Sequence, residues 1–315
     1  MPEATAVAPS PHHLLQKLEW KVLKRLDGAL QGDYRTLFRG HGVDLADLRE
    51  YQLHDDVRHI DWNVTARLSI PHVREFLEER DLTVWFLLDL SPSIDFGSQR
   101  RKREVSEAFV AVMASVVLRH GNRAGAVLYG SSVDTVLPAK SGRLHVLHMM
   151  QRMRMRGAAA ANGTTRLAEL IERARPSIKR RSSVFVVSDF ISESGWESSL
   201  ARLAQRHDVV AVRLFDPLEM TLPELGMVLM QDAETGEQIF VDTGARGFRE
   251  RFEAAAERRE AELRGALTRA GVDTLELPTD GDLGDSILAF VDARRQRSRM
   301  AAGALPLHNR ARRTA

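Results

Sequence analysis

The chain has 315 residues, 43% of them hydrophobic and 28% charged, with a formal net charge of +2 at pH 7. This composition is that of a globular protein with a sizeable core, and the charge is too small to indicate a polyanionic partner. Cysteine is absent, which excludes disulfides, thiolate metal sites and cysteine nucleophiles. No run approaches the roughly 18 apolar residues of a membrane helix, and the start lacks a signal-peptide core, so we expect a soluble, cytoplasmic protein.

The first 80 residues precede the main domain. We expect residues 1–12 to be disordered and residues 13–80 to pack on the main domain, beginning with a helix over 13–26. Over 47–67, charged residues alternate with Tyr and Trp, a composition that a flexible linker would lack. The charged side chains either pair with each other and with Glu75, Glu78 and Glu79, which would anchor the segment and which we favour, or belong to an exposed partner surface. The residues of this signature are Arg49, Tyr51, Asp55, Asp56, Arg58, Asp61, Trp62 and Arg67.

A strand predicted over 83–88 organises the main domain. Its six consecutive apolar or β-branched residues are typical of a strand buried on both faces of a parallel sheet. A polar loop with Asp89, Ser91 and Ser93 follows it. Ligands bind beyond the carboxyl ends of the strands in such sheets, and a cluster of hard oxygen atoms suits Mg²⁺. Taken alone, the same residues are also consistent with a solvated turn closed by Pro92.

Strands and helices alternate over the rest of the chain, which predicts an α/β fold with a doubly wound, mostly parallel sheet flanked by helices. Further strands are predicted over 123–129, 133–137, 183–189, 209–215 and 274–277, with a hairpin over 228–241. Helices are predicted over 102–119, 144–155, 167–175, 196–205, 247–270 and 283–295. This main domain would span 81–293. Residues 294–315, rich in arginine, would form a basic flexible tail.

Two later loops strengthen the interpretation as a metal site. Thr164 and Thr165 come directly before the helix predicted over 167–175, and Asp189 ends the buried strand predicted over 183–189. Both loops therefore fall in the places where they can join the loop after Asp89 at one edge of the sheet.

The chain resembles a known bacterial family, catalogued as domain of unknown function fifty-eight. The likeness runs from about Gly32 to Phe290 and is carried by ordered motifs. These are Gly-x-Gly at 40–42, Leu-Arg-Glu-Tyr at 48–51, Asp-Asp-x-Arg-x-Ile-Asp-Trp at 55–62, Ala-Arg at 66–67, the segment 73–81, the loop Asp-x-Ser-x-Ser, and Arg-Leu-Phe-Asp-Pro-Leu-Glu at 213–219. One departure is His54, where the family commonly has Gly.

The resemblance implies a fold like that of von Willebrand factor A domains, with a metal-ion-dependent adhesion site. Ser91, Ser93 and Thr165 match its hydroxyl ligands, with Thr164 as the alternative threonine, and Asp89 and Asp189 match its carboxylates. Such a site holds Mg²⁺, with Mn²⁺ as a substitute, and leaves one position for an acidic side chain of a protein client. The family is typically encoded beside MoxR-type AAA+ ATPases, which implies an adaptor that works with such an ATPase.

Other functions are less well supported by the residues. A nucleotide site lacks its glycine motifs, a serine hydrolase lacks its nucleophile elbow, and a zinc centre lacks its paired histidines. A metal-dependent hydrolase stays as an alternative, although no His or Glu sits within the three metal loops to act as a base. Nucleic-acid binding through the arginine tail is the third hypothesis, with a steep salt dependence as its signature. We expect a binding module that is not an enzyme.

Overall fold

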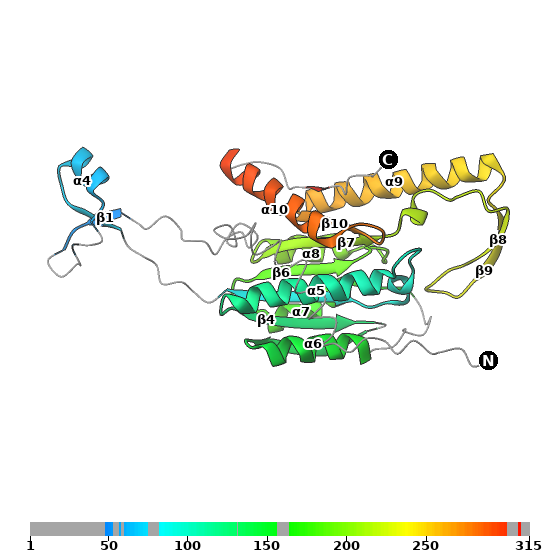
Figure 1. The fold of residues 1–315 in the computed structure, drawn as a ribbon, viewed down its shortest axis with the longest axis horizontal. Coiled ribbons are helices and arrows are strands. Elements are labelled where there is room, and N and C mark those ends of the chain that lie inside the picture. Colours follow the sequence, from blue (N-terminus) through cyan, green and yellow to red (C-terminus); the bar gives the residue numbers. More distant parts are fainter. Residues whose placement is uncertain are drawn as a thin grey trace.

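The computed structural model describes residues 48–52, 57, 60–74, 82–130, 132–155, 164–300 and 308–309 (Figure 1). Predictions for residues 1–47, for Asp55, Asp56 and Arg58, and for the charged residues at 75–79 lie outside this part of the chain. Among the helices that are described, none combines the length and apolar composition needed to cross a membrane.

A seven-stranded sheet forms the centre of the main domain. Its order is β11-β10-β7-β6-β3-β4-β5, and every neighbouring pair is parallel except β4 and β5. The strands are β3 (Thr83–Asp89), β4 (Arg123–Tyr129), β5 (Val133–Lys140), β6 (Ser183–Ser188), β7 (Asp208–Phe215), β10 (Asp273–Pro278) and β11 (His308–Asn309). The predicted doubly wound, mostly parallel sheet is confirmed.

Helices cover both faces of this sheet, because successive strand residues point to opposite faces. Phe86 and Leu88 of β3 pack with one set of helices, and Trp85 and Leu87 pack with the other. The first set is α5 (Lys102–Arg119), α6 (Arg143–Met155) and α10 (Leu283–Met300). The second set is α7 (Leu167–Ala174), α8 (Trp196–Ala204) and α9 (Arg246–Arg269). Figure 1 shows α5, α6 and α10 on the near side, with α7 and α8 behind the sheet.

The direction in which the chain adds strands reverses between β3 and β6. From β3 the chain builds outward through β4 to β5, and it then returns to place β6 on the other side of β3. In an open α/β sheet, the crevice outside the carboxyl ends of two such strands is the usual ligand site. Asp89 ends β3 and Asp189 follows β6 directly, so the topology brings the two predicted metal loops to this crevice.

Residues 48–74 contain a small unit of their own. Strand β1 (Leu48–Glu50) pairs antiparallel with β2 (His72–Arg74), and α4 (Trp62–Leu68) lies between them in sequence. Asp61 is buried, and its carboxylate accepts a hydrogen bond of 3.2 Å from the backbone of Val64. Because this bond satisfies a free N–H in the first turn of α4, Asp61 has the role of a helix cap.

The signature residues of this unit differ in burial. Tyr51 is half-buried and Arg67 is exposed, while the Trp62 side chain is 69% exposed. The backbone of Arg49 lies in β1. Asp61 is therefore engaged within the unit, whereas the exposed Trp62 indole gains little from packing, and the anchoring of this segment to the main domain stays a prediction.

Two elements extend beyond the sheet. The hairpin of β8 (Met227–Gln231) and β9 (Gln238–Asp242) is present as predicted and hydrogen-bonds only with itself among the described strands. Helix α10 runs to Met300, past the predicted end at 295. Arg294 and Arg297 are buried in ion pairs with Asp273, so these two arginines are part of the packed domain instead of the predicted tail.

Candidate metal centre

The loop after β3 folds back on itself and buries its polar side chains. Asp89 and Ser91 are fully buried, and Ser93 is 6% exposed. The Ser91 backbone N–H donates to Asp89 Oδ1 over 3.0 Å, and the hydroxyl oxygens of Ser91 and Ser93 are 3.1 Å apart. A short 3₁₀ helix, η3 (Pro92–Asp95), begins at the proline between them. The predicted turn at Pro92 is therefore real, but it turns the two hydroxyls inward instead of exposing them to solvent.

The end of β6 is joined to this loop. The hydroxyl of Ser188 donates to Asp89 Oδ2 over 2.6 Å, and the backbone N–H of Ile191 donates to Asp189 Oδ1 over 3.0 Å. Between them, Phe190 has a φ of 60°, a left-handed conformation that is strained for an aromatic residue. Such strain is typical of backbone that the surrounding contacts hold in place, often at functional sites.

The third loop supplies Thr165, which is 3% exposed. Its carbonyl accepts hydrogen bonds from the Ser192 hydroxyl and the Glu193 backbone, so the loop is fixed to the segment that follows β6. Thr164 is exposed, and its hydroxyl donates to Glu193. Of the two candidate threonines, Thr165 is the buried one, and its hydroxyl donates to Glu234.

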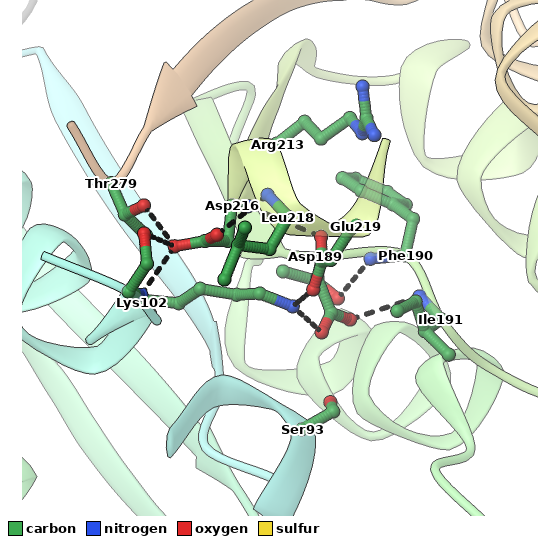
Figure 2. Close-up of polar contacts among 12 residues, drawn as sticks. Ser93, Lys102, Asp189, Phe190, Ile191, Arg213, Asp216, Leu218, Glu219 and Thr279 are labelled. Atoms are coloured by element: carbon green, nitrogen blue, oxygen red, sulfur yellow. Dashed lines mark hydrogen bonds and ion pairs between the residues drawn. The ribbon is translucent and has the colours of Figure 1, made fainter. Parts of the chain in front are cut away.

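Lys102 is a residue of the candidate site that the sequence did not single out. It lies in the first turn of α5, is fully buried, and places its ammonium 2.8 Å from Asp189 Oδ2 (Figure 2). A second ion pair joins it to Glu219. Burial opposes the charge of Lys102, but the two carboxylates outweigh burial and raise its pKa. The sequence did carry a signal, because Lys102 continues the apolar stripe of Val105 and Phe109 at i, i+3 and i+7 spacing.

Glu219 is held in place by Asp216, the first residue after β7. The Asp216 carboxylate is fully buried and accepts hydrogen bonds from the Ser98 backbone at 2.6 Å and from the Thr279 hydroxyl at 2.5 Å. It also caps the short helix η5 (Pro217–Glu219) by accepting the Leu218 N–H at 2.9 Å. Figure 2 shows this chain of contacts from Thr279 through Asp216 and Glu219 to Lys102. The family motif at 213–219 therefore positions the lysine that contacts Asp189.

Glu234 is the second residue that was missed. It lies in the turn between β8 and β9, yet its side chain reaches the site and is only 9% exposed. Its carboxylate accepts the Thr165 N–H at 2.6 Å and the Thr165 hydroxyl at 2.5 Å, and it also receives a hydrogen bond from Ser93. Burial raises the pKa of Glu234. No local pattern marks Glu234, since acidic residues are ordinary in exposed turns.

The electrostatic balance of this site is negative. Burial, and then the neighbouring charge of Asp189, raise the pKa of Asp89 to about 6. Four carboxylates lie close enough here to share a contact or to repel one another, namely those of Asp89, Asp189, Glu219 and Glu234. Among their described contacts, the positive charge is that of Lys102. Buried carboxylates in excess over cations are unfavourable unless they take up protons, which the raised pKa of Asp89 favours, or a further positive charge joins them.

The donor atoms fit a small, hard divalent cation. Three hydroxyls and the nearby carboxylates offer only oxygen, which Mg²⁺ and Mn²⁺ prefer. Within the described residues, no three carboxylate or imidazole side chains are arranged to hold a metal by themselves. An ion at this place would therefore depend on the hydroxyls of Ser91, Ser93 and Thr165, together with Asp89 and Asp189.

Comparison with known proteins gives relatives without an established function. The family described as "Protein of unknown function DUF58" matches residues 47–262. The uncharacterised protein Rv1480 of Mycobacterium tuberculosis is 35% identical over 285 residues, covering 90% of this chain and 89% of that protein. The uncharacterised protein YeaD of Bacillus subtilis is 27% identical over 181 residues, covering 56% of this chain and 42% of that protein.

Among solved structures, the chain is similar to an aerotolerance-related membrane protein from Bacteroides fragilis. The TM-score is 0.46 at 14% identity, over 69% of this chain and 99% of that one. A conserved hypothetical protein, BatB, from Bacteroides thetaiotaomicron gives a TM-score of 0.43 at 13% identity, over 68% of this chain and 99% of that one.

Proposed function

The chain belongs to the DUF58 family of proteins of unknown function, and we propose that it is a protein-binding module that uses a divalent cation to grip an acidic side chain of a partner. The observation that carries this proposal is the site at the β3–β6 switch point. There, three hydroxyls lie with a group of buried carboxylates that outnumber the one ammonium among their described contacts. A binding role needs no catalytic group beyond this set.

The residues of the site would have different roles in binding a cation. Ser91, Ser93 and Thr165 offer neutral hydroxyl oxygens, while Asp89 and Asp189 supply the negative charge and fix the loops through their hydrogen bonds. When bound, Mg²⁺ would supply a Lewis-acidic position at which a carboxylate of the partner completes the coordination. Lys102 sets the orientation of Asp189 by holding one of its two oxygens.

The identity of the partner rests on the family resemblance. The likeness to proteins encoded beside MoxR-type AAA+ ATPases supports a role as an adaptor between such an ATPase and a client that presents an acidic residue. Remodelling or assembly of other proteins is the process in which we place this activity.

A metal-dependent hydrolase is the competing proposal, and it needs a base near the ion. Glu234 brings a carboxylate to the site from outside the three metal loops. Both of its oxygens, however, accept hydrogen bonds from Thr165, which favours a binding role over proton abstraction from water. Metal-dependent turnover of phosphoesters or peptides that is lost in Asp189→Ala would support the hydrolase.

The first test measures metal binding directly. We expect Ser91→Ala and Thr165→Val to weaken Mg²⁺ binding by at least about tenfold in calorimetric titrations, because each removes a ligand oxygen without opening the core. Ser183→Ala is the matched control, since its buried hydroxyl lies at the opposite end of β6 from Asp189. Identical Mg²⁺ titration curves for all four proteins would reject the site assignment.

The second test concerns the partner. Affinity capture by the wild-type chain should fail in EDTA and recover with Mg²⁺ or Mn²⁺, and Ca²⁺ should serve less well because it favours more ligands at longer distances. Asp89→Ala should lose the same proteins in the presence of Mg²⁺. Capture that survives EDTA would show that the partner binds elsewhere on the chain.

A further inference from the structure

The β8–β9 hairpin carries a preformed turn at its tip. Asp232 Oδ1 accepts the backbone N–H groups of Glu234 and Thr235, both over 2.8 Å. Gly236 has a φ of 74°, a left-handed conformation that a residue without a side chain adopts at no steric cost. The turn is therefore set by its own residues, and it presents Glu234 in a fixed direction.

Glu234 is the buried side chain of an otherwise exposed hairpin tip, and Val241 of β9 is the buried residue of the strands. Glu234 is 9% exposed, whereas Leu229 and Phe240, which face each other across the two strands, are 50% and 74% exposed. In Figure 1 the hairpin lies at the end of the sheet to which the β4 arrow points, which is the end that holds the candidate metal centre. The hairpin therefore does not pack broadly on the domain, and its tip enters the site through one acidic side chain.

The base of the hairpin is fixed separately. The Thr243 hydroxyl donates to the carbonyl of Gly226 over 2.8 Å and accepts the Leu225 N–H over 2.9 Å. A two-stranded hairpin is marginally stable by itself in water. The position of the tip therefore depends strongly on the contacts that Glu234 makes with Thr165 and Ser93.

We propose that Glu234 is a built-in acidic ligand of this site, which takes the position that the partner's carboxylate would occupy. This inference rests on the proposed function, because it names the group with which an incoming acid must compete. A carboxylate from the same chain binds without the loss of translational freedom that a separate partner suffers, so it is an effective competitor. A partner then engages the site only after the hairpin tip has left it.

The inference can be tested with Mn²⁺, whose effect on water proton relaxation reports the water molecules bound to the ion. At saturating protein, the relaxivity per bound Mn²⁺ should rise in Glu234→Gln and Glu234→Ala by the equivalent of about one water, since a water replaces the lost carboxylate. Glu237→Gln is the matched control, because Glu237 is an exposed acid in the same turn. It should match the wild type.

Acetate serves as the simplest incoming carboxylate. In Glu234→Ala, millimolar acetate should return the relaxivity to the wild-type value, while the wild type itself should not respond. If the hairpin tip occupies the site for about nine-tenths of the time, removing Glu234 should lower the apparent dissociation constant for acetate about tenfold.

The outcomes separate this inference from the proposed function. Mn²⁺ that binds both wild type and Glu234→Ala with equal relaxivity would overturn the inference and leave the metal site standing. Mn²⁺ that binds neither protein would overturn the metal site and the inference together. Circular dichroism and melting curves for each variant exclude misfolding as the cause.

Discussion

The two ends of the sheet differ in how many cations pair with their buried carboxylates. At the amino ends of β7 and β10, Asp208 and Asp273 meet Arg294, which lies 2.8 Å from each, and Arg297 also contacts Asp273 at 2.6 Å. Two carboxylates there face two guanidinium groups. At the carboxyl ends of β3 and β6, the carboxylates outnumber the one ammonium among their described contacts.

This contrast is the one we expect between a structural cluster and a candidate binding site. Paired charges satisfy one another, so the amino end can hold α10 against the sheet without any ligand. Among the described residues, the carboxyl end keeps a surplus of negative charge and of hydroxyl lone pairs over the one ammonium that contacts them. Burial alone is therefore a poor guide to function, and the balance of charge within a buried cluster is a better one.

The largest effect is expected at the amino end. Arg294→Ala removes the guanidinium that pairs with both Asp208 and Asp273, and we expect the free energy of unfolding to fall by about 3–5 kcal/mol in urea denaturation. Arg258→Ala, at an exposed position on α9, is the control and should change stability by less than about 0.5 kcal/mol. A small effect of Arg294→Ala would remove the basis for calling this cluster structural.

The opposite sign is expected at the carboxyl end. Without metal at pH 7, Asp89→Asn should raise the free energy of unfolding by about 1–3 kcal/mol, because it replaces a buried charge beside Asp189 with a neutral group of similar shape. Differential scanning calorimetry in EDTA would measure this change. A loss of stability in the variant would mean that the Asp89 charge is compensated within the chain.

Asp89→Asn should also differ from the wild type in its response to Mg²⁺. At a concentration one hundred times the dissociation constant, Mg²⁺ should stabilise the wild type by about 2.7 kcal/mol and leave Asp89→Asn nearly unchanged. The Ser183→Ala control should respond to Mg²⁺ as the wild type does.

The smallest effect on stability is expected in the unit of residues 48–74. An exposed side chain of this unit can be compared with the buried charges at both ends of the sheet. Because the Trp62 indole is 69% exposed, Trp62→Ala should change the free energy of unfolding by less than about 0.5 kcal/mol. Partner capture should nevertheless weaken if this residue belongs to a binding surface. A fall of several kcal/mol would instead restore the anchor that the sequence favoured.

The sequence by itself determined the architecture. Apolar runs and helical periodicity located the strands and helices of the main domain except β11, which lies in the segment predicted as a flexible tail, and helix α5 was predicted with its observed bounds. These signals are local, because each depends on which faces of one element are buried. The resemblance then placed five oxygen-bearing residues on three loops. The order of the strands brings two of these loops to one crevice, and hydrogen bonds to Ser192 and Glu193 join the Thr165 loop to them.

Only the tertiary structure decided how the charges of the site are balanced. Lys102 had a weak local signal as a cation on an apolar stripe, but its partners Asp189 and Glu219 lie far along the chain. Glu234 had no local signal, because the position of a hairpin tip depends on the path of the whole chain and not on the residues of its turn. The carboxyl end of α10 and the exposure of Trp62 followed the same rule. Contacts between distant segments set both, and no short pattern encodes such contacts.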